Sequence, residues 1–309
     1  MTAHSYEHYH AHGHGHAHRR DALTTAFALG TGLNLVFVAV EAAFGIIGNS
    51  MALLADAGHN LGDVLALLVA WGASTLARRR PSARFTYGLR GTTILAALFN
   101  ALVLLVVVGG IAGEAIRRLG APEPVVGRTV IIVAAIGIAI NGLTALLFAA
   151  GRKGDLNVRG AFLHMVADAA VSAGVVAAGI AILLTGWLWL DPAVSLMIGA
   201  VIVYGTWALL RESIALSLDA VPAGIDPREV QDFLAGLPGV ARIHDLHVWP
   251  MSTTEVALTC HLIMPRGHPG DEFTHQAAKD LHRRFGIGHA TLQIEVSADY
   301  ACALTEHAD

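Results

Sequence analysis

Six apolar segments, each about as long as a membrane-spanning helix, most constrain what this chain of 309 residues can fold into. A helix needs about 20 mainly apolar residues to cross the hydrocarbon core of a bilayer. The segments are Leu23–Ile47, Met51–Ala77, Thr92–Ile116, Thr129–Ala150, Ala161–Leu184 and Leu188–Leu210. The sequence therefore predicts a membrane protein with an all-α bundle of six transmembrane helices.

Charged residues are scarce in the first two thirds of the chain. Residues 22–210 hold 19 Asp, Glu, Lys or Arg in 189 positions, whereas residues 211–309 hold 21 in 99. A soluble protein has about a quarter of its residues charged. We expect a His-rich disordered tail at 1–21, a six-span transmembrane domain at 22–210, a soluble domain at 211–300 and a C-terminal tail at 301–309.

Basic residues next to the spans predict the orientation, because they concentrate on the cytoplasmic side. With the N-terminus in the cytoplasm, eleven lie inside and three lie outside. The inside set is Arg19, Arg20, Arg78, Arg79, Arg80, Arg84, Arg90, Arg152, Lys153, Arg159 and Arg211, and the outside set is Arg117, Arg118 and Arg128. We expect a multi-pass protein of a bacterial inner membrane with both termini cytoplasmic.

Shorter and alternating apolar patterns follow the last predicted span. They predict a helix that starts at Asp226-Pro227 and ends by Gly239, strands at Ala241–Trp249 and Glu255–Met264, a helix at Gly270–Phe285 and a strand at Ala290–Val296. This αββαβ order indicates a small α+β domain with its helices on one face of the sheet.

Two of the predicted spans carry the pattern His-x-x-x-Asp. His59 and Asp63 lie in the second span, and His164 and Asp168 lie in the fifth. A spacing of four places each His and Asp on one helix face. Two such faces provide two nitrogens and two oxygens, a set that tetrahedral Zn²⁺ accepts. The alternative is that each pair is a hydrogen bond that only stiffens the bundle.

Neutral His and ionised Asp bind metal, so protons compete with metal for such a site. The sequence lacks the glycine-rich phosphate-binding loop of P-loop ATPases, which favours proton-coupled transport. Asp56 and Glu41 are candidates for a gate or a pathway. Other intramembrane polar residues either line a pathway or bond between helices: Asn34, Asn100, Glu114, Asn141 and Ser172.

Seven of the 17 histidines lie in the N-terminal tail. They are His4, His8, His10, His12, His14, His16 and His18. Such a segment has no core to bury, yet several imidazoles can gather around one cation. We expect it to capture or buffer metal weakly, the alternative being a solubilising tail. The net charge of −4 and the absence of a Lys/Arg-rich stretch interleaved with aromatic residues argue against nucleic acid as a partner.

Several separated motifs resemble the cation diffusion facilitator family, most closely its bacterial zinc, cobalt and cadmium exporters. They are the run Gly48–Asp63, Phe-Thr-Tyr-Gly at 85–88, His-Met-Val-Ala-Asp at 164–168 and His-Asp-Leu-His-Val-Trp at 244–249. The resemblance implies a six-span homodimer with a ferredoxin-like cytoplasmic domain. It also implies export of divalent metal in exchange for protons, with no enzymatic activity and no organic cofactor.

The resemblance also implies roles for individual residues. The transport site falls on His59, Asp63, His164 and Asp168, and a histidine at the first position is associated with zinc over cadmium. A cytoplasmic metal site falls on His244, His261 and Glu295, and an acid that pairs with a basic residue in relatives falls on Asp219. The usual basic partner is missing, so we expect Arg90 in its place.

Strand periodicity places His244 and His247, three positions apart, on opposite faces of their strand. Two other functions stay open: a membrane metal sensor or scaffold without transport, and export mainly of Co²⁺, Cd²⁺ or Ni²⁺. An intramembrane metalloprotease is disfavoured because the His-Glu-x-x-His pattern is absent.

Overall fold

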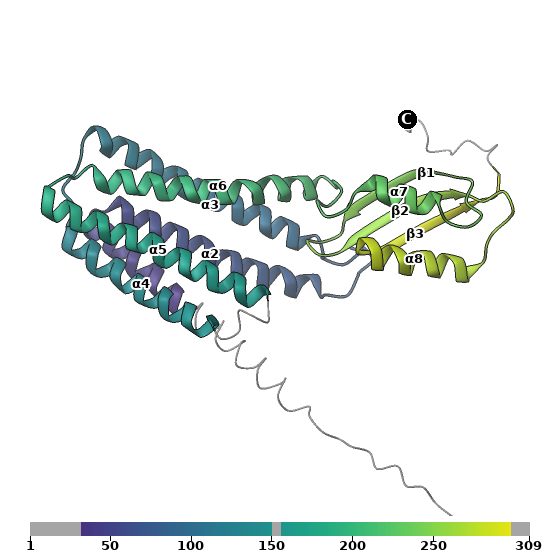
Figure 1. Cartoon of the computed structure of the whole chain (residues 1–309), viewed down its shortest axis with the longest axis horizontal. Coiled ribbons are helices and arrows are strands. Elements are labelled where there is room, and N and C mark those ends of the chain that lie inside the picture. Colours follow the sequence, from purple (N-terminus) through teal and green to yellow (C-terminus); the bar gives the residue numbers. More distant parts are fainter. Residues whose placement is uncertain (1–31, 150–155, 298–309) are drawn as a thin grey trace, which may run out of the picture. The chain divides into compact units, whose positions relative to one another are not determined.

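The computed structural model describes residues 32–149 and 156–297. The His-rich tail, the start of the first predicted span and the C-terminal tail lie outside these residues. The chain divides into two units, 1–64 with 106–203 and 65–105 with 204–309. The prediction of a helical membrane bundle followed by a small α+β domain is confirmed (Figure 1).

The apolar segments form a helix at Gly32–Ile47 and five longer helices. These five are α2 (Met51–Ala77), α3 (Thr92–Gly120), α4 (Gly127–Ala149), α5 (Leu156–Thr185) and α6 (Leu190–Ser217). Within the described residues, each of the five is long and apolar enough to span a bilayer. α6 runs seven residues beyond the predicted Leu210, because a helix can continue past the apolar stretch that marks the membrane.

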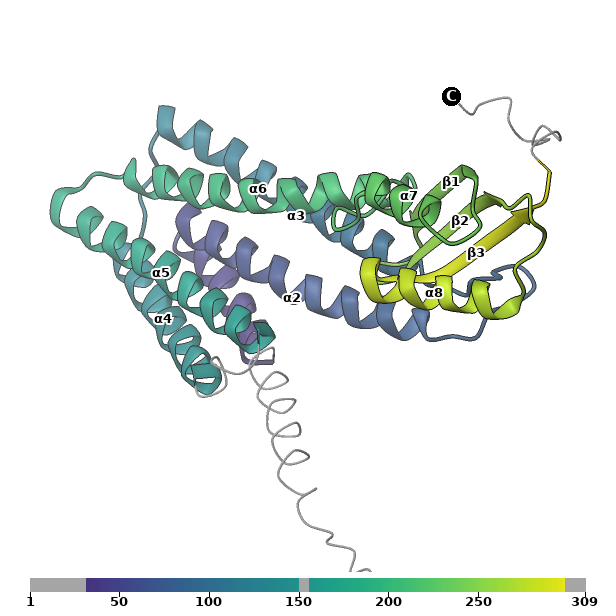
Figure 2. The same ribbon diagram turned by 45° about the vertical axis from the view of Figure 1, so that its right-hand side comes forward.

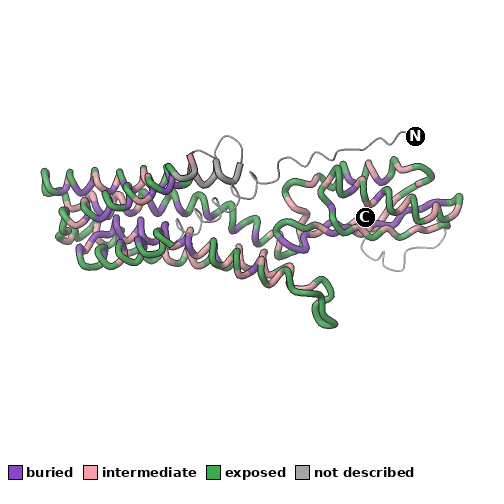
Figure 3. Tube along the Cα trace, turned by 90° about the horizontal axis from the view of Figure 1, so that it is seen from below, coloured by how far each residue is buried: buried purple, intermediate pink, exposed green. Residues whose placement is uncertain are grey.

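α4 and α5 lie side by side in both views of the ribbon (Figures 1 and 2). Small residues allow this approach: a Cβ added to Gly127 would lie 2.9 Å from the Leu183 side chain, and one added to Gly179 would lie 2.9 Å from Ile131. Buried and exposed positions alternate along the helices (Figure 3), and many large apolar side chains are exposed. Exposed apolar side chains are what a lipid-facing surface requires.

The start of α2 is fixed by an acid from the start of α6. The buried carboxyl group of Asp191 accepts hydrogen bonds from Ser50 Oγ at 2.5 Å, from the Met51 amide at 2.6 Å and from the Ala52 amide at 3.3 Å. Ser50 Oγ also accepts from the Leu53 amide at 3.2 Å. The first amides of a helix have no partner within the helix, so these acceptors stabilise the first turn of α2.

The C-terminal elements follow the predicted αββαβ order. They are α7 (Pro227–Ala235), β1 (Arg242–Pro250), β2 (Val256–Ile263), α8 (Asp271–Phe285) and β3 (Ile287–Glu295). β2 is the central strand, antiparallel to β1 and parallel to β3. Asp226 caps α7 by accepting from the Arg228 amide, as the Asp-Pro pair predicts.

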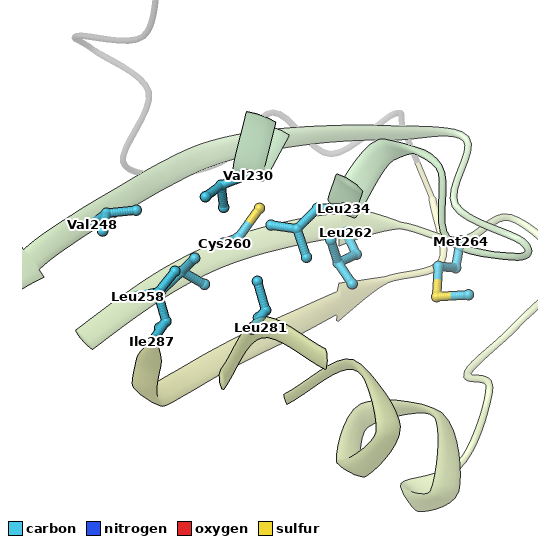
Figure 4. Close-up of a cluster of buried hydrophobic side chains, with 9 residues drawn as sticks. All are labelled: Val230, Leu234, Val248, Leu258, Cys260, Leu262, Met264, Leu281 and Ile287. Atoms are coloured by element: carbon cyan, nitrogen blue, oxygen red, sulfur yellow. The ribbon is translucent and has the colours of Figure 1, made fainter. Parts of the chain in front are cut away.

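Both helices of this domain cover one face of the sheet (Figures 1 and 4). The core between these helices and the sheet contains nine buried residues: Val230, Leu234, Val248, Leu258, Cys260, Leu262, Met264, Leu281 and Ile287. Alternate residues of β2 enter this core, so the intervening residue His261 belongs to the opposite face. That face carries the second candidate site.

Candidate metal sites

The two His-x-x-x-Asp motifs come together between α2 and α5. His59 Nε2 lies 3.2 Å from Asp168 Oδ1, and His164 Nε2 lies 3.2 Å from Asp63 Oδ2. Within each helix the His-to-Asp distances are longer, 3.9 Å in α2 and 3.7 Å in α5. The shortest contacts therefore join the two helices, and all four predicted residues lie in one ring of alternating imidazole and carboxylate groups.

The four His-to-Asp contacts of this ring are close to the ligand spacing of a tetrahedral metal site. Zinc binds nitrogen and oxygen at about 2.0–2.2 Å, which places neighbouring ligand atoms of a tetrahedron about 3.3–3.5 Å apart. The four His-to-Asp contacts span 3.2 to 3.9 Å. The ligand atoms of His59, Asp63 and Asp168 all lie within 4.8 Å of one another. Three of the four residues are therefore close enough to hold one metal ion, and His164 has to move closer to complete a four-ligand site.

Burial differs around this ring. The Asp168 side chain is 2% exposed, whereas those of His59, Asp63 and His164 are 21%, 33% and 43% exposed. Gly58, next to His59, lies against Ile111, where an added Cβ would approach to 3.1 Å. The ring is thus closed at Asp168 and open at His164.

A second group of imidazole and carboxylate side chains lies on the sheet face opposite the core. His244 of β1 is directly across from His261 of β2, and their ring centroids are 4.9 Å apart. Glu295 of β3 contacts both, with Oε2 2.9 Å from His244 Nε2 and Oε1 3.0 Å from His261 Nδ1. The hydrogen bond from His244 holds the pKa of Glu295 below its usual range. The structure therefore brings the three predicted residues of the soluble domain together.

A β-bulge shapes this second group, and it overturns the predicted placement of His247. His244 pairs with His261 and His247 pairs with Thr259, so two residues of β1 face one residue of β2. Because 259 and 261 share a face of β2, His244 and His247 share a face of β1. The prediction of opposite faces was wrong, since strict alternation fails at a bulge.

Asp245 is a potential ligand that the sequence reasoning missed. It lies in the bulge with a φ of 53°, a conformation that Asp tolerates better than most residues. Its carboxylate oxygens lie 3.0 Å from His247 Nε2 and 3.4 Å from His261 Nε2. The signal was its place between two histidines in the sequence His-Asp-Leu-His.

Arg90 has an ion-pair partner in the structure that the sequence did not predict. Arg90 Nη1 lies 3.1 Å from Glu255 Oε1, just before β2. Asp219 is exposed two residues after the end of α6, with a φ of 58°. Pairing of Arg90 with Asp219 stays a prediction, and the histidines of the N-terminal tail lie outside the described residues.

The weaker intramembrane candidates also separate into groups. Glu114 pairs with Arg117 and Arg118 at distances of 2.6 and 3.0 Å, so its charge is balanced by neighbours on its own helix. Glu41 and Asp56 are fully buried and lie close to Asn60 and Ser172. These four form a polar cluster distinct from the His-Asp ring.

Two family models match consecutive parts of the chain. The cation efflux transmembrane domain matches residues 28–216, and the cytoplasmic domain of cation efflux proteins matches residues 222–297. Together they cover both the helical bundle and the α+β domain.

Relatives with assigned names align over most of the chain. It is 36% identical over 270 residues to the metal cation efflux system protein CzcD of Cupriavidus metallidurans, covering 87% of this chain and 85% of that protein. It is 35% identical over 295 residues to the zinc transporter ZitB of Escherichia coli, and the alignment covers 95% of this chain and 92% of that protein. It is 32% identical over 288 residues to the cadmium, cobalt and zinc/H(+)-K(+) antiporter of Bacillus subtilis, covering 90% of each.

Proposed function

The chain belongs to the cation efflux family, the cation diffusion facilitators, and we propose that its cargo is Zn²⁺, which it carries out of the cytoplasm in exchange for protons. The family and these relatives are multi-pass membrane transporters of metal cations. We place this protein in a bacterial inner membrane as a homodimer, with both termini in the cytoplasm. The relatives' names, which include zinc transport and H⁺ antiport, support both finer assignments.

The observation that carries the proposal is the ring of His59, Asp63, His164 and Asp168. It joins two nitrogen and two oxygen donors from two membrane-spanning helices, and its four His-to-Asp contacts are close to the ligand spacing of a tetrahedral metal. Carboxylates are costly at membrane depth, about 2.5–3.5 kcal/mol each on insertion scales, and in membrane helices they mark ion pathways. The alternative, a hydrogen bond that only stiffens the bundle, would not require a second His-Asp pair with the same spacing on another helix.

The same ring explains how protons drive the exchange. Metal binds when both imidazoles are neutral and both carboxylates are ionised, so it displaces the protons that the ring holds at lower pH. If the ring opens alternately to each side of the membrane, metal enters from the less acidic side and protons replace it on the more acidic side. The pH gradient then powers export without ATP.

The C-terminal cluster of His244, His261 and Glu295 supports a second metal role in the soluble domain. Its three groups are held by three neighbouring strands, and Asp245 adds a carboxylate next to His261. We propose that it binds cytoplasmic zinc and regulates transport. We propose that the His-rich tail captures or buffers metal ions weakly.

The test is zinc flux into proteoliposomes, measured with and without a pH gradient. His164→Ala and Asp168→Ala should each abolish flux, while His275→Ala, on the exposed surface of α8, should leave it unchanged. Normal flux in the two ring variants would refute the assigned site. Wild-type flux that ignores the pH gradient would refute proton coupling.

Metal selectivity is tested in the same vesicles by competition. Zinc flux should fall less with added Co²⁺, Cd²⁺ or Ni²⁺ than with unlabelled Zn²⁺ at equal concentration. Metal binding without flux of any of these ions would favour a sensor or scaffold instead.

A further inference from the structure

A polar cluster lies next to the metal ring without belonging to it. It consists of Glu41 on the helix Gly32–Ile47, Asp56 and Asn60 on α2, and Ser172 on α5. Glu41, Asp56 and Ser172 are 0% exposed and Asn60 is 3% exposed. Two carboxyl groups are thus completely buried among three membrane helices, where an ionised group is costly unless it is paired.

The cluster has too few hydrogen-bond donors for two ionised carboxylates. Asn60 Nδ2 donates to Glu41 Oε2 at 3.1 Å, and Ser172 Oγ donates to Asp56 Oδ2 at 2.9 Å. The remaining oxygens, Glu41 Oε1 and Asp56 Oδ1, are buried and lack a donor among the described residues. The two carboxyl groups lie within hydrogen-bonding range of each other. One proton between them supplies the missing donor and removes the repulsion of like charges.

The four ionisable groups of the ring lie on the two helices that carry Asp56 and Ser172. His59 and Asp63 belong to α2, and His164 and Asp168 to α5. The described part of the first helix carries no other charged residue than Glu41, and the described part of α4 carries only Arg128, in its first turn. On α3, Glu114 pairs with Arg117 and Arg118, and on α6 Asp191 accepts from the first amides of α2. Among the described residues, Asp56 interacts electrostatically with Glu41 and with His59 and Asp168 of the ring.

Helical spacing links the pair to the ring. His59 follows Asp56 by three residues on α2, and Ser172 follows Asp168 by four on α5, so each helix places a member of both groups on one side, a turn apart. His59 and Asp168 both interact electrostatically with Asp56. When a dication replaces fewer than two protons in the ring, the ring gains positive charge, and this charge stabilises negative charge on Asp56 one turn away.

We propose that Glu41 and Asp56 hold one shared proton and form a proton site separate from the four metal ligands. When metal binds the ring, the proton leaves for water and the pair changes its charge from −1 to −2. When metal leaves, the pair takes a proton up again. This places one proton of the exchange outside the ligand set, and its role in transport rests on the proposed function.

The proposal is tested by counting the protons released per zinc bound. The full-length protein in lipid nanodiscs is titrated with Zn²⁺ by calorimetry, in buffers of different ionisation enthalpy. The variants are Glu41→Gln and Asp56→Asn, which keep the shape of each side chain and provide an amide donor in place of the proton. The tail and the C-terminal cluster are identical in all variants, so their protons cancel in the difference.

Both variants should bind zinc and release about one proton fewer per metal than the wild type. The factor by which zinc affinity rises for each unit increase in pH should accordingly be about ten times smaller in the variants than in the wild type. Glu212→Gln, the same change at an exposed position of α6, should release the wild-type number of protons. Asp168→Asn should instead lose binding at the ring.

Two results would overturn the proposal. One is an unchanged proton count in both pair variants with zinc binding intact. The other is loss of zinc binding in both, as in Asp168→Asn, which would make the pair part of the metal site. A wild-type protein that binds zinc but carries none across proteoliposomes would refute the proposed function alone, because the proton count needs no transport.

Discussion

Replacing Asp191 tests whether an acid from α6 fixes the start of α2, the helix that carries His59 and Asp63 of the His-Asp ring. The Asp191→Ala variant leaves the amides of Met51 and Ala52 without their acceptor in a buried position. An unsatisfied buried donor costs about 1–3 kcal/mol, so the two amides together cost about 2–6 kcal/mol. The Ser50 hydroxyl can rotate to another acceptor, so we expect a loss of about 4 kcal/mol from the free energy of unfolding.

Asp191→Asn provides the graded comparison. Its amide oxygen still accepts one of the hydrogen bonds, but its NH₂ group faces the remaining donor, so we expect about half the loss, about 2 kcal/mol. Asp232→Ala removes an exposed acid of α7 and should change stability by less than about 0.5 kcal/mol. The free energy of unfolding is measured by titrating the protein in mixed micelles with SDS. If Asp191→Ala is as stable as Asp232→Ala, the capping argument is wrong.

Three further predictions concern packing and the soluble domain. Gly137→Ala should destabilise the bundle by about 1–3 kcal/mol, because the added Cβ would lie 2.7 Å from Phe37 Cζ. Gly142→Ala on the same helix adds its Cβ in open space and should leave the stability unchanged. Equal unfolding free energies for the two variants would contradict this. The second cysteine of the chain, Cys302, is first replaced by serine. Cys260 should then resist thiol reagents at pH 8 until the protein unfolds, because burial raises its pKa to about 12. Rapid labelling of the folded protein would contradict this. The lowered pKa of Glu295 stabilises the metal-free protein above the unfolded pKa of about 4.3 and ceases to do so as pH falls through the folded value. Glu295→Gln should therefore flatten the acid limb of the unfolding curve, and an unchanged limb would rule out this linkage.

Hydropathy alone predicted most of the helical part, because a lipid environment demands long apolar helices. The predicted span Met51–Ala77 is α2 residue for residue. α4 begins two residues before its predicted start, and the predicted last residue, Ala150, lies outside the described residues. The motif spacing also predicted which side chains share a helix face. It did not predict that the closest His-to-Asp contacts run between helices, because the sequence carries no measure of the offset between α2 and α5.

In the C-terminal domain, the sequence predicted the order of the strands but not which face of its strand each residue occupies. The αββαβ order follows from alternation and turn residues, and the structure confirms it. One extra residue at Asp245 then reverses the facing of His247, and a single sequence gives no signal for where alternation fails. Likewise, the sequence placed Glu41 and Asp56 in spans, but only the packing of three helices shows that their oxygens lack donors.

Under the proposed function, the geometry of the ring gives a physical reason why its affinity for metal changes during transport. Each His and its own Asp are fixed by one helix, so their distances of 3.7 and 3.9 Å change little when helices move. The 3.2 Å contacts of His59 with Asp168 and of His164 with Asp63 cross between α2 and α5. A slide of α5 along α2 by half a turn, about 2.7 Å, would lengthen both cross contacts beyond a tetrahedral edge and leave two weak pairs. Metal binds such a split ring less tightly, and differential affinity between two states is what lets a ligand shift a conformational equilibrium. Cysteines introduced in pairs across α2 and α5 should therefore change their cross-linking pattern with zinc, whereas a ring that stays rigid would give one pattern at all zinc concentrations.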